Sequence, residues 1–421
     1  MMVMDETFDG WAFPKNGNSQ DFSTHFNQTI SADNKLLGAT TGDTWYKFIL
    51  ESNIERDKND PSVIIWDIGN ELNFGVPEAG KSQYEQYAKN MKSYIEAIDK
   101  TRPITVGDNN PNGLQNANTQ EFRNKVSTVL AKNGEGLAGA NYSMGSMAGI
   151  HKTHPDWKII ATESASPSNS RGIYNTLSQY NKTGDYQCTA YDTNAVPWGN
   201  TARESWWYTI KDDFVSGEFI WTGFDYIGEP TPWNGTDKGS VSGDKLAVPN
   251  SSYFGVIDTA GFEKDSFYFY TSQWREDKQT LHIVPQSWNK KDLSISGGKV
   301  PVYVYSNAAK VELYLNGKLI GTSTRNPIKT AAGHEWATYS NESNDEEQCV
   351  AVNESQKWKA QAIQFKVKYA EGTLSAKAYD EDGKEITDTL GSQSVTTNSD
   401  AGSKLSVKAE KSKITADGSS L

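Results

Sequence analysis

Two glutamates end two apolar runs of this sequence. The first run is SVIIWDIGNE, from Ser62 to Glu71, and the second is KIIATE, from Lys158 to Glu163. A continuous apolar run bounded by Asp60-Pro61 and Gly69 predicts a strand covered on both faces, which is typical of a parallel sheet. In a parallel α/β barrel, the carboxyl ends of the strands form the active-site face. Two carboxyl groups placed there can share the roles of proton donor and nucleophile or base, as the cleavage of a glycosidic bond requires.

The spacing of the two glutamates fits a barrel. The interval between Glu71 and Glu163 has room for three strand–helix units of roughly 30 residues each. Helical periodicity predicts helices at Thr44–Ile54, Tyr84–Ile98, Phe122–Leu130 and Trp206–Val215. The other strands are predicted at Met2–Asp5, Ile104–Gly107, Leu137–Tyr142 and Gly217–Trp221.

The predicted strands number six, whereas a closed barrel of this kind has eight. No room for another strand precedes Met2. We therefore expect an incomplete (β/α)8 TIM barrel whose first two strands would lie before residue 1, and a chain that begins inside a domain.

After Trp274 the pattern changes to short alternating runs separated by Asn-Gly, Glu-Gly and Asp-Gly turns, which predicts an immunoglobulin-like β-sandwich. Asn316-Gly317 is the strongest hairpin signal. Residues 333–357 are polar and predict a surface insertion. The expected domains are a catalytic barrel over residues 1–275, a sandwich over 276–390, a linker over 391–402 and the start of a further immunoglobulin-like module over 403–421.

Several ordered segments together resemble glycoside hydrolase family 2, in particular its bacterial β-galactosidase-like members. These segments are SVIIWDIGNE, IIATESASPSNSRGIY, AVPWG, GEFIWTGFDYIGEPTPW and SSYFGVIDTAGFEKDSFYFYTSQW. The resemblance covers residues 1 to about 390, and MVMDE at Met2–Glu6 is similar to the third barrel strand of the family. It implies a chain that is truncated at both ends.

The resemblance also implies roles for individual residues. Glu71 would be the general acid/base, with a raised pKa, and Glu163 the ionised nucleophile. Asn70 would donate a hydrogen bond to the sugar 2-hydroxyl, Tyr142 would orient the nucleophile, and Trp221 would form an aromatic wall beside the sugar.

Two further residues are weaker candidates for substrate binding. Arg171 follows the nucleophile and would balance negative charge, and Trp198 lies in a proline-flanked loop that would line a sugar subsite. A loop tryptophan that packs on the core is at least as common. Single glutamates at strand ends are commonly solvated or paired with arginine, so the catalytic interpretation depends on the motifs taken together.

Composition restricts the partners. The formal net charge of −12 over 421 residues argues against binding nucleic acid. Two cysteines predict no disulfide framework, and no apolar run has membrane-spanning length. The 13 tryptophans and 20 tyrosines suit sugar stacking, although a large barrel core also explains them.

The predicted function is a retaining exo-glycosidase that hydrolyses terminal β-D-galactosides in oligosaccharides or glycoconjugates. The alternatives are another specificity of the family, β-glucuronidase or β-mannosidase, or an inactive sugar-binding or structural fragment. We expect a bacterial protein outside the cell or at its surface. No cofactor and no metal site are predicted, and the sequence leaves a structural cation and the oligomeric state open.

Overall fold

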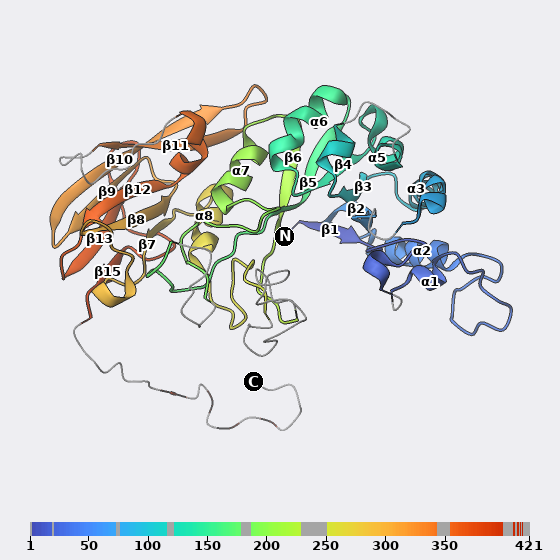
Figure 1. The fold of residues 1–421 in the computed structure, drawn as a ribbon, viewed down its shortest axis with the longest axis horizontal. Helices are drawn as coiled ribbons and strands as arrows, with labels where there is room; N and C mark the ends of the chain where they lie inside the picture. The colour runs from blue at the N-terminus through green and yellow to red at the C-terminus, as the bar shows by residue number, and fades with distance from the viewer. Residues whose placement is uncertain are drawn as a thin grey trace.

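The computed structural model describes residues 2–18, 21–72, 76–115, 122–177, 187–228, 251–342 and 354–398, with single positions at 407, 408, 411, 413 and 415. These residues form a curled parallel sheet with helices, followed by antiparallel sheets (Figure 1). The two parts are the predicted incomplete barrel and the predicted β-sandwich.

Six strands form the parallel sheet and pair in the order in which they occur in the chain. They are β1 (Val3–Glu6), β2 (Val63–Asn70), β3 (Ile104–Asp108), β4 (Leu137–Asn141), β5 (Lys158–Ala165) and β6 (Val215–Trp221). Every predicted barrel strand is therefore confirmed. Since β1 and β6 are the two edges of this sheet, the described strands form part of a barrel and not a closed one.

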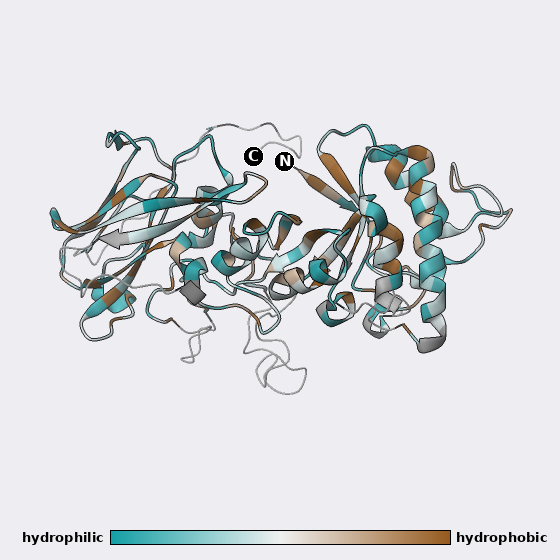
Figure 2. Cartoon of the chain, turned by 90° about the horizontal axis from the view of Figure 1, so that it is seen from above, coloured by the Kyte–Doolittle hydropathy of each residue, from teal (hydrophilic) through white to brown (hydrophobic). Residues whose placement is uncertain are grey.

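Helices lie between successive strands. They are α1 (Ser23–Phe26), α2 (Trp45–Asp57), α3 (Glu78–Ile98), α4 (Pro111–Leu114), α5 (Phe122–Ala131), α6 (Met147–Thr153), α7 (Ala202–Ile210) and α8 (Asp265–Trp274). Strands β3 and β4 are buried along their whole length, as expected for a sheet covered by helices. Trp66 of β2 packs in one core with Ile54 of α2 and Ile95 of α3. Figure 2 shows brown hydrophobic segments along the strands near the N-terminus.

The predicted helix over residues 206–215 was misplaced. Helix α7 ends at Ile210, and Val215 already begins β6. The start of α7 is fixed by Thr201, whose side chain accepts a hydrogen bond from the backbone N–H of Glu204 at 3.4 Å. Thr-x-x-Glu is a capping-box pattern that marks a helix start. This signal was present in the sequence and places the helix four residues earlier than the apolar periodicity did.

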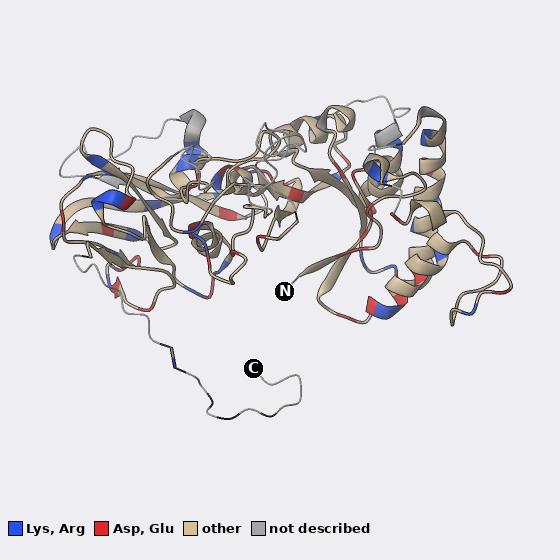
Figure 3. Ribbon diagram, turned by 60° about the horizontal axis from the view of Figure 1, so that its bottom comes forward, with Lys and Arg blue, Asp and Glu red and all other residues tan. Residues whose placement is uncertain are grey.

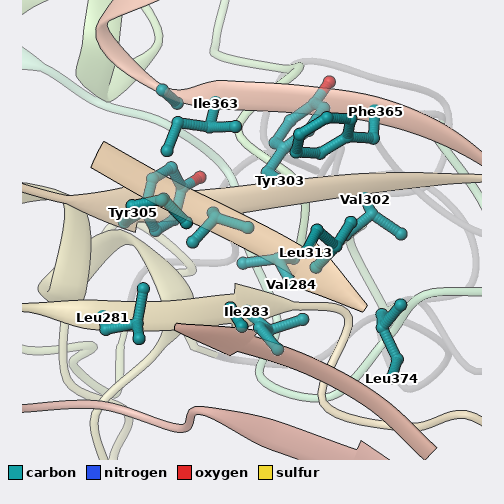
Figure 4. Close-up of a cluster of buried hydrophobic side chains, with 14 of the residues drawn as sticks. Leu281, Ile283, Val284, Val302, Tyr303, Tyr305, Leu313, Ile363, Phe365 and Leu374 are labelled. Carbon is teal, nitrogen blue, oxygen red and sulfur yellow. The ribbon is translucent and has the colours of Figure 1, made fainter. Parts of the chain in front are cut away.

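The sandwich consists of two antiparallel sheets. One has the order β11-β10-β9-β13-β14, with β15 paired to β13, and the other has the order β12-β8-β7. The strands are β7 (Leu281–Val284), β8 (Lys299–Ser306), β9 (Lys310–Leu315), β10 (Lys318–Lys329), β11 (Glu335–Glu342), β12 (Ile363–Lys368), β13 (Thr373–Tyr379), β14 (Glu385–Ile386) and β15 (Ser394–Thr396). Figure 4 shows Ile283, Val302, Phe365 and Leu374 among the buried side chains between the sheets.

The turn between β9 and β10 is the predicted hairpin. Asn316 and Gly317 have φ values of 53° and 77°, the left-handed pair that a two-residue type I′ turn requires. Its register continues on both sides, since Lys318 pairs with Leu315.

Two boundaries in the sandwich differ from those expected. Residues 335–342, expected in a surface insertion, form β11, which pairs with β10 from Glu335 to Glu342. Residues 394–396, expected in a linker, form β15 on β13. Both stretches are rich in polar residues, and the pairing of their backbones outweighs that composition. The centre of the expected insertion (343–353), the end of the GEPTPW motif (229–233) and most of the expected further module (403–421) lie outside the described residues.

Charges of both signs are spread over both parts of the chain, as Figure 3 shows for the described residues. Within the described ranges, no helix has the length and apolarity needed to cross a membrane.

Candidate active site at the carboxyl ends of the barrel strands

Three barrel strands end in an unusual backbone conformation. Glu71 follows β2 with φ 47°, Tyr142 follows β4 with φ 48°, and Ala165 and Ser166 at the end of β5 have φ 62° and 64°. A left-handed conformation is uncommon for residues other than glycine, and such residues concentrate at functional sites. These turns therefore mark the carboxyl ends of β2, β4 and β5 as the candidate site.

The Asn70 and Glu71 side chains are held by Asn141, the last residue of β4. The Asn141 amide donates to Asn70 Oδ1 at 2.9 Å and to Glu71 Oε1 at 3.3 Å. Thr162 fixes the Asn141 amide in turn by donating to its Oδ1 at 2.6 Å. At Gly107 of β3, a Cβ atom would stand 2.8 Å from Asn141 Oδ1 and 3.1 Å from Asn70 Oδ1, so the absence of a side chain makes room for this pair.

Glu163 lies beside Tyr142. The backbone N–H of Tyr142 donates to the Glu163 carbonyl at 2.8 Å, and the phenol hydrogen-bonds to the Glu163 carboxyl group. Ser166 Oγ donates to the Tyr142 hydroxyl at 3.3 Å. Burial, together with the Glu163 charge, keeps the pKa of Tyr142 above its ordinary value, so the phenol stays protonated and available as a donor.

The surroundings of Glu163 contain groups that oppose its ionisation and groups that favour it. Burial raises its pKa to about 7; the hydrogen bond from Tyr142 lowers the pKa, repulsion from Glu71 and Glu6 raises it, and the Lys15 ammonium lowers it. Burial and the two neighbouring carboxyl groups disfavour the charged form, whereas the phenol and the cation favour it. An ionised Glu163 stays a prediction.

Trp221, at the end of β6, lies next to the end of β5. It pairs with Ala165, and its carbonyl accepts from the Ser166 N–H at 3.2 Å. Its indole N–H donates to the Tyr226 hydroxyl at 3.3 Å, and the two rings are edge to face at 6.0 Å. The side chain is partly exposed. The role of Trp221 as a sugar-contacting wall stays a prediction.

The loop that carries Trp198 is attached to the residues that follow the nucleophile. The Asn200 N–H donates to the Ala165 carbonyl at 2.7 Å, and the Val196 N–H to the Ser166 carbonyl at 3.4 Å. The Trp198 side chain is 48% exposed, so it is not a residue that packs the loop on the core. Its role in a sugar subsite is still a prediction.

Arg171 contacts a different set of residues. Its Nε donates to Asp258 at 2.7 Å, and its guanidinium lies 4.7 Å from the centre of the Phe262 ring. Among the described residues, its ion pair is with Asp258 and not with either glutamate. The structure thus brings Asn70, Glu71, Tyr142 and Glu163 together and engages Arg171 elsewhere.

Sequence reasoning missed three residues of this site. Asn141 was predicted only as part of a strand. Its position resembles that of Asn70, because Asn141-Tyr142 follows β4 as Asn70-Glu71 follows β2, with the asparagine as the last strand residue in each case. Asp9 and Lys15 lie in the segment after β1, where both hydrogen-bond to Asn70, and no local pattern marks them. Within the described part of the chain, no cluster of three or more histidine, cysteine or acidic side chains is arranged to hold a metal ion.

The arrangement provides two carboxyl groups, one with an amide and one with a phenol as partner, at the mouth of the half barrel. One can deliver and take up a proton while the other attacks an electrophilic carbon. Such a pair with different surroundings is the equipment of a two-step glycosidase.

Comparison with known families agrees with this chemistry. The family model of the TIM barrel domain of glycosyl hydrolases family 2 matches residues 1–251, and a domain of unknown function matches residues 297–387. The second match lies within the sandwich.

Individual relatives cover more than the barrel. A β-galactosidase of Bacteroides ovatus is 33% identical over an alignment of 363 positions that covers 77% of this chain and 37% of that protein. A putative β-glucuronidase of Formosa agariphila is 28% identical over an alignment of 370 positions that covers 80% of this chain and 29% of that protein. This chain therefore spans about a third of the length of these relatives.

A solved structure has the same fold. A family 2 member from Bacteroides cellulosilyticus aligns with 100% of this chain and 43% of its own, with a TM-score of 0.59 and 24% identity. Together with the family match and the 33% identity to the Bacteroides ovatus protein, the site and the fold lead to one conclusion. The chain belongs to glycoside hydrolase family 2 and contains TIM barrel sequence of that family over residues 1–251.

Proposed function

We propose that the protein is a retaining exo-glycosidase that hydrolyses terminal β-D-galactosides of oligosaccharides or glycoconjugates. The observation that carries the proposal is the pairing of Glu71 with Asn141 and of Glu163 with Tyr142 at the carboxyl ends of β2, β4 and β5. Glu71 is the general acid/base and Glu163 is the nucleophile.

The reaction has two steps. Glu163 attacks the anomeric carbon while Glu71 protonates the leaving oxygen, so the glycosidic bond breaks and a glycosyl–Glu163 ester forms. Glu71, now ionised, then removes a proton from water, which attacks the anomeric carbon and releases Glu163. In the reactive state the proton must be on Glu71 and the charge on Glu163. Tyr142 and Lys15 both lower the pKa of Glu163 and so favour this distribution.

Two observations support galactose over glucuronic acid. The resemblance implies that glucuronidases bind the substrate carboxylate with an Asn-x-Lys motif. The corresponding stretch here, DTAGFEKDSF, lacks this motif, and its lysine, Lys264, is buried and paired with Asp225 at 2.6 Å. Asn289-Lys290-Lys291 matches the Asn-x-Lys motif, but it lies in the sandwich. There the Asn289 amide donates to Asp292 at 3.2 Å. The chain is also more similar to the protein named a β-galactosidase, at 33% identity, than to the putative β-glucuronidase, at 28%.

The test is a panel of aryl β-glycosides of galactose, glucuronic acid and mannose, assayed with the full-length protein. We expect the highest kcat/KM on the galactoside, free galactose as the sugar product from an oligosaccharide, and no turnover by Glu163→Gln. Preferred cleavage of the glucuronide or mannoside would refute the proposed sugar. Cleavage of none of the three would refute the proposed activity.

A further inference from the structure

The segment after β1 crosses the end of β2 and is fixed there by a tryptophan. Trp11 is fully buried, and its indole N–H donates to the Ile68 carbonyl at 2.7 Å. A Cβ atom at Gly69 would stand 2.7 Å from the Trp11 indole nitrogen, so the glycine allows this close approach. The neighbouring Asp9 is thereby brought to Asn70, whose backbone N–H donates to the Asp9 carbonyl at 3.1 Å.

An ion pair in this segment contacts Asn70 in two further ways. Asp9 Oδ1 accepts from Lys15 Nζ at 2.6 Å and from Asn70 Nδ2 at 3.2 Å. Lys15 Nζ also donates to the Asn70 carbonyl at 3.2 Å. The Lys15 side chain is 14% exposed, whereas that of Asp9 is 66% exposed. The lysine is thus the enclosed member of the pair and holds the aspartate in place.

These contacts orient the Asn70 amide. Its oxygen accepts from Asn141, and one of its two amide hydrogens goes to Asp9. A primary amide has two N–H donors, and among the described residues the second one has no hydrogen-bond partner, so it is available to a ligand. Because Asp9 and Asn141 occupy the other amide hydrogen and the oxygen, the direction of the remaining N–H is set.

The same pair steadies the peptide that joins Asn70 to Glu71. Lys15 Nζ donates to the carbonyl of this peptide, which belongs to Asn70. The N–H of the peptide, which belongs to Glu71, donates to the Gly107 carbonyl at 2.8 Å. Both sides of the peptide are thus held, which supports the left-handed conformation of Glu71.

We propose that Asp9, held by Lys15, is a positioning residue that aims the free N–H of Asn70 at the sugar 2-hydroxyl. This inference rests on the proposed function. A hydrogen bond to the 2-hydroxyl strengthens as positive charge develops on the sugar ring, so the contribution of Asp9 belongs to the transition state. It also depends on the presence of that hydroxyl, which makes it measurable.

The experiment compares an aryl β-galactoside with its 2-deoxy counterpart in the full-length protein. Asp9→Ala should lower kcat/KM on the galactoside by up to about 100-fold, the usual effect of misplacing a reacting group by 1 Å. On the 2-deoxy substrate it should lower kcat/KM less than threefold. Asp9→Asn keeps an acceptor oxygen for Asn70 and should retain most of the activity.

A mutant cycle separates positioning from a structural role. In an Asn70→Ala background, Asp9→Ala should have no further effect on the galactoside, because both changes remove one interaction. Asp43→Ala, which breaks the partly exposed Lys47–Asp43 pair, is the matched control and should change neither substrate.

Three results would overturn the inference. Equal losses on both substrates would make Asp9 a structural residue, and no loss on either would make the pair an ordinary surface contact. If the wild-type protein cleaves no β-glycoside, the proposed function itself fails. This result can be told apart from the other two because it is seen before any Asp9 variant is made.

Discussion

The two glutamates differ in what surrounds them, and the proposed roles follow this difference. Glu163 bonds to a phenol and lies near a lysine, both of which stabilise a carboxylate. Glu71 accepts a hydrogen bond from the Asn141 amide and itself has the left-handed backbone conformation. The arrangement suits attack by Glu163 and proton transfer by Glu71.

The role of Glu71 can be tested by bypassing it. Glu71→Gln should slow breakdown of the glycosyl ester by about 100-fold or more, because water then lacks a general base. An aryl galactoside with a good leaving group needs little acid help, so the first step should largely survive. Added azide, which attacks without base catalysis, should restore turnover and yield a β-galactosyl azide.

Two observations would contradict this assignment. One is azide rescue of Glu163→Gln with retention of configuration, which would exchange the two roles. The other is full activity of Glu71→Gln on substrates with poor leaving groups, which need the acid most.

Lys15 should shift the acid limb of the pH–activity profile. In the proposed mechanism Glu163 must be ionised to attack. Burial raises its pKa, as do Glu71 and Glu6, whereas Tyr142 and Lys15 lower it. Lys15→Met removes the cation, so the pKa of Glu163 rises and activity is lost at a higher pH than in wild type. The profile of kcat/KM reports this ionisation in the free enzyme. Lys47→Met is the control, and an acid limb that stays in place or moves downward in Lys15→Met would count against this role.

At the scale of elements, the site depends on the close approach of β3 and β4. A Cβ atom at Gly139 of β4 would stand 2.3 Å from the Val106 carbonyl oxygen and 2.8 Å from Thr105 Oγ1. Gly139→Ala must therefore push the strands apart two residues before Asn141. We expect a loss of about 1–3 kcal/mol in the free energy of unfolding, as for other overpacked cores.

A nearby glycine provides the control for this substitution. At Gly145, the nearest atom to an added Cβ is the Tyr208 hydroxyl at 3.7 Å, an ordinary contact. Gly145→Ala should leave stability nearly unchanged in denaturant titration. Equal stability of the Gly139 and Gly145 variants would mean that the β3–β4 contact is not tightly packed.

Most elements could be predicted from periodicity because their signals are local. The strand ending at Glu71 and the Asn316-Gly317 hairpin each follow from a few neighbouring residues. Strand β11 was missed because its composition is polar. Its residue Tyr339 nevertheless packs in the core of the sandwich, and its backbone pairs with β10 along the whole strand.

The contacts within the site could be predicted less well than its residues. The strand-end glutamates, Asn70 and Tyr142 follow from the motifs. Lys15 contacts a residue far along the chain, and that proximity depends on how Trp11 packs on β2. Arg171 is close to Glu163 in the sequence, but in the structure its ion pair is with Asp258. Spacing alone does not determine such pairings.

At the scale of the molecule, α7 of the barrel is joined to the sandwich through Arg203. The guanidinium is 2% exposed, pairs with Asp192 at 2.8 Å and donates to the Lys359 carbonyl at 3.2 Å. Gln361 donates to the Arg203 carbonyl at 2.6 Å, and the guanidinium lies over the Tyr303 ring at 4.9 Å. The loop that carries Trp198 lies between Asp192 and α7, so the sandwich supports the rim of the site.

Loss of this arginine should affect the whole fold. Arg203→Met leaves Asp192 buried without its cation, which commonly costs about 3–5 kcal/mol of the free energy of unfolding. Arg275→Met, which breaks the exposed pair with Asp277, should cost far less, because solvent screens the attraction between exposed charges. Thermal or denaturant unfolding of both variants measures the difference, and similar costs for the two would show that the buried pair does not hold the parts together.

The central claim is that Glu163 forms a covalent glycosyl ester. A dinitrophenyl 2-deoxy-2-fluoro-β-D-galactoside tests it, because the fluorine slows both steps while the activated leaving group keeps the first step faster than the second. Full-length protein incubated with this compound should lose activity with release of one dinitrophenol per active site. Peptide mass spectrometry should then find the fluorogalactosyl group on Glu163. The account would be contradicted by a label on Glu71 or another residue, or by unlabelled protein that hydrolyses β-galactosides with inversion at the anomeric carbon.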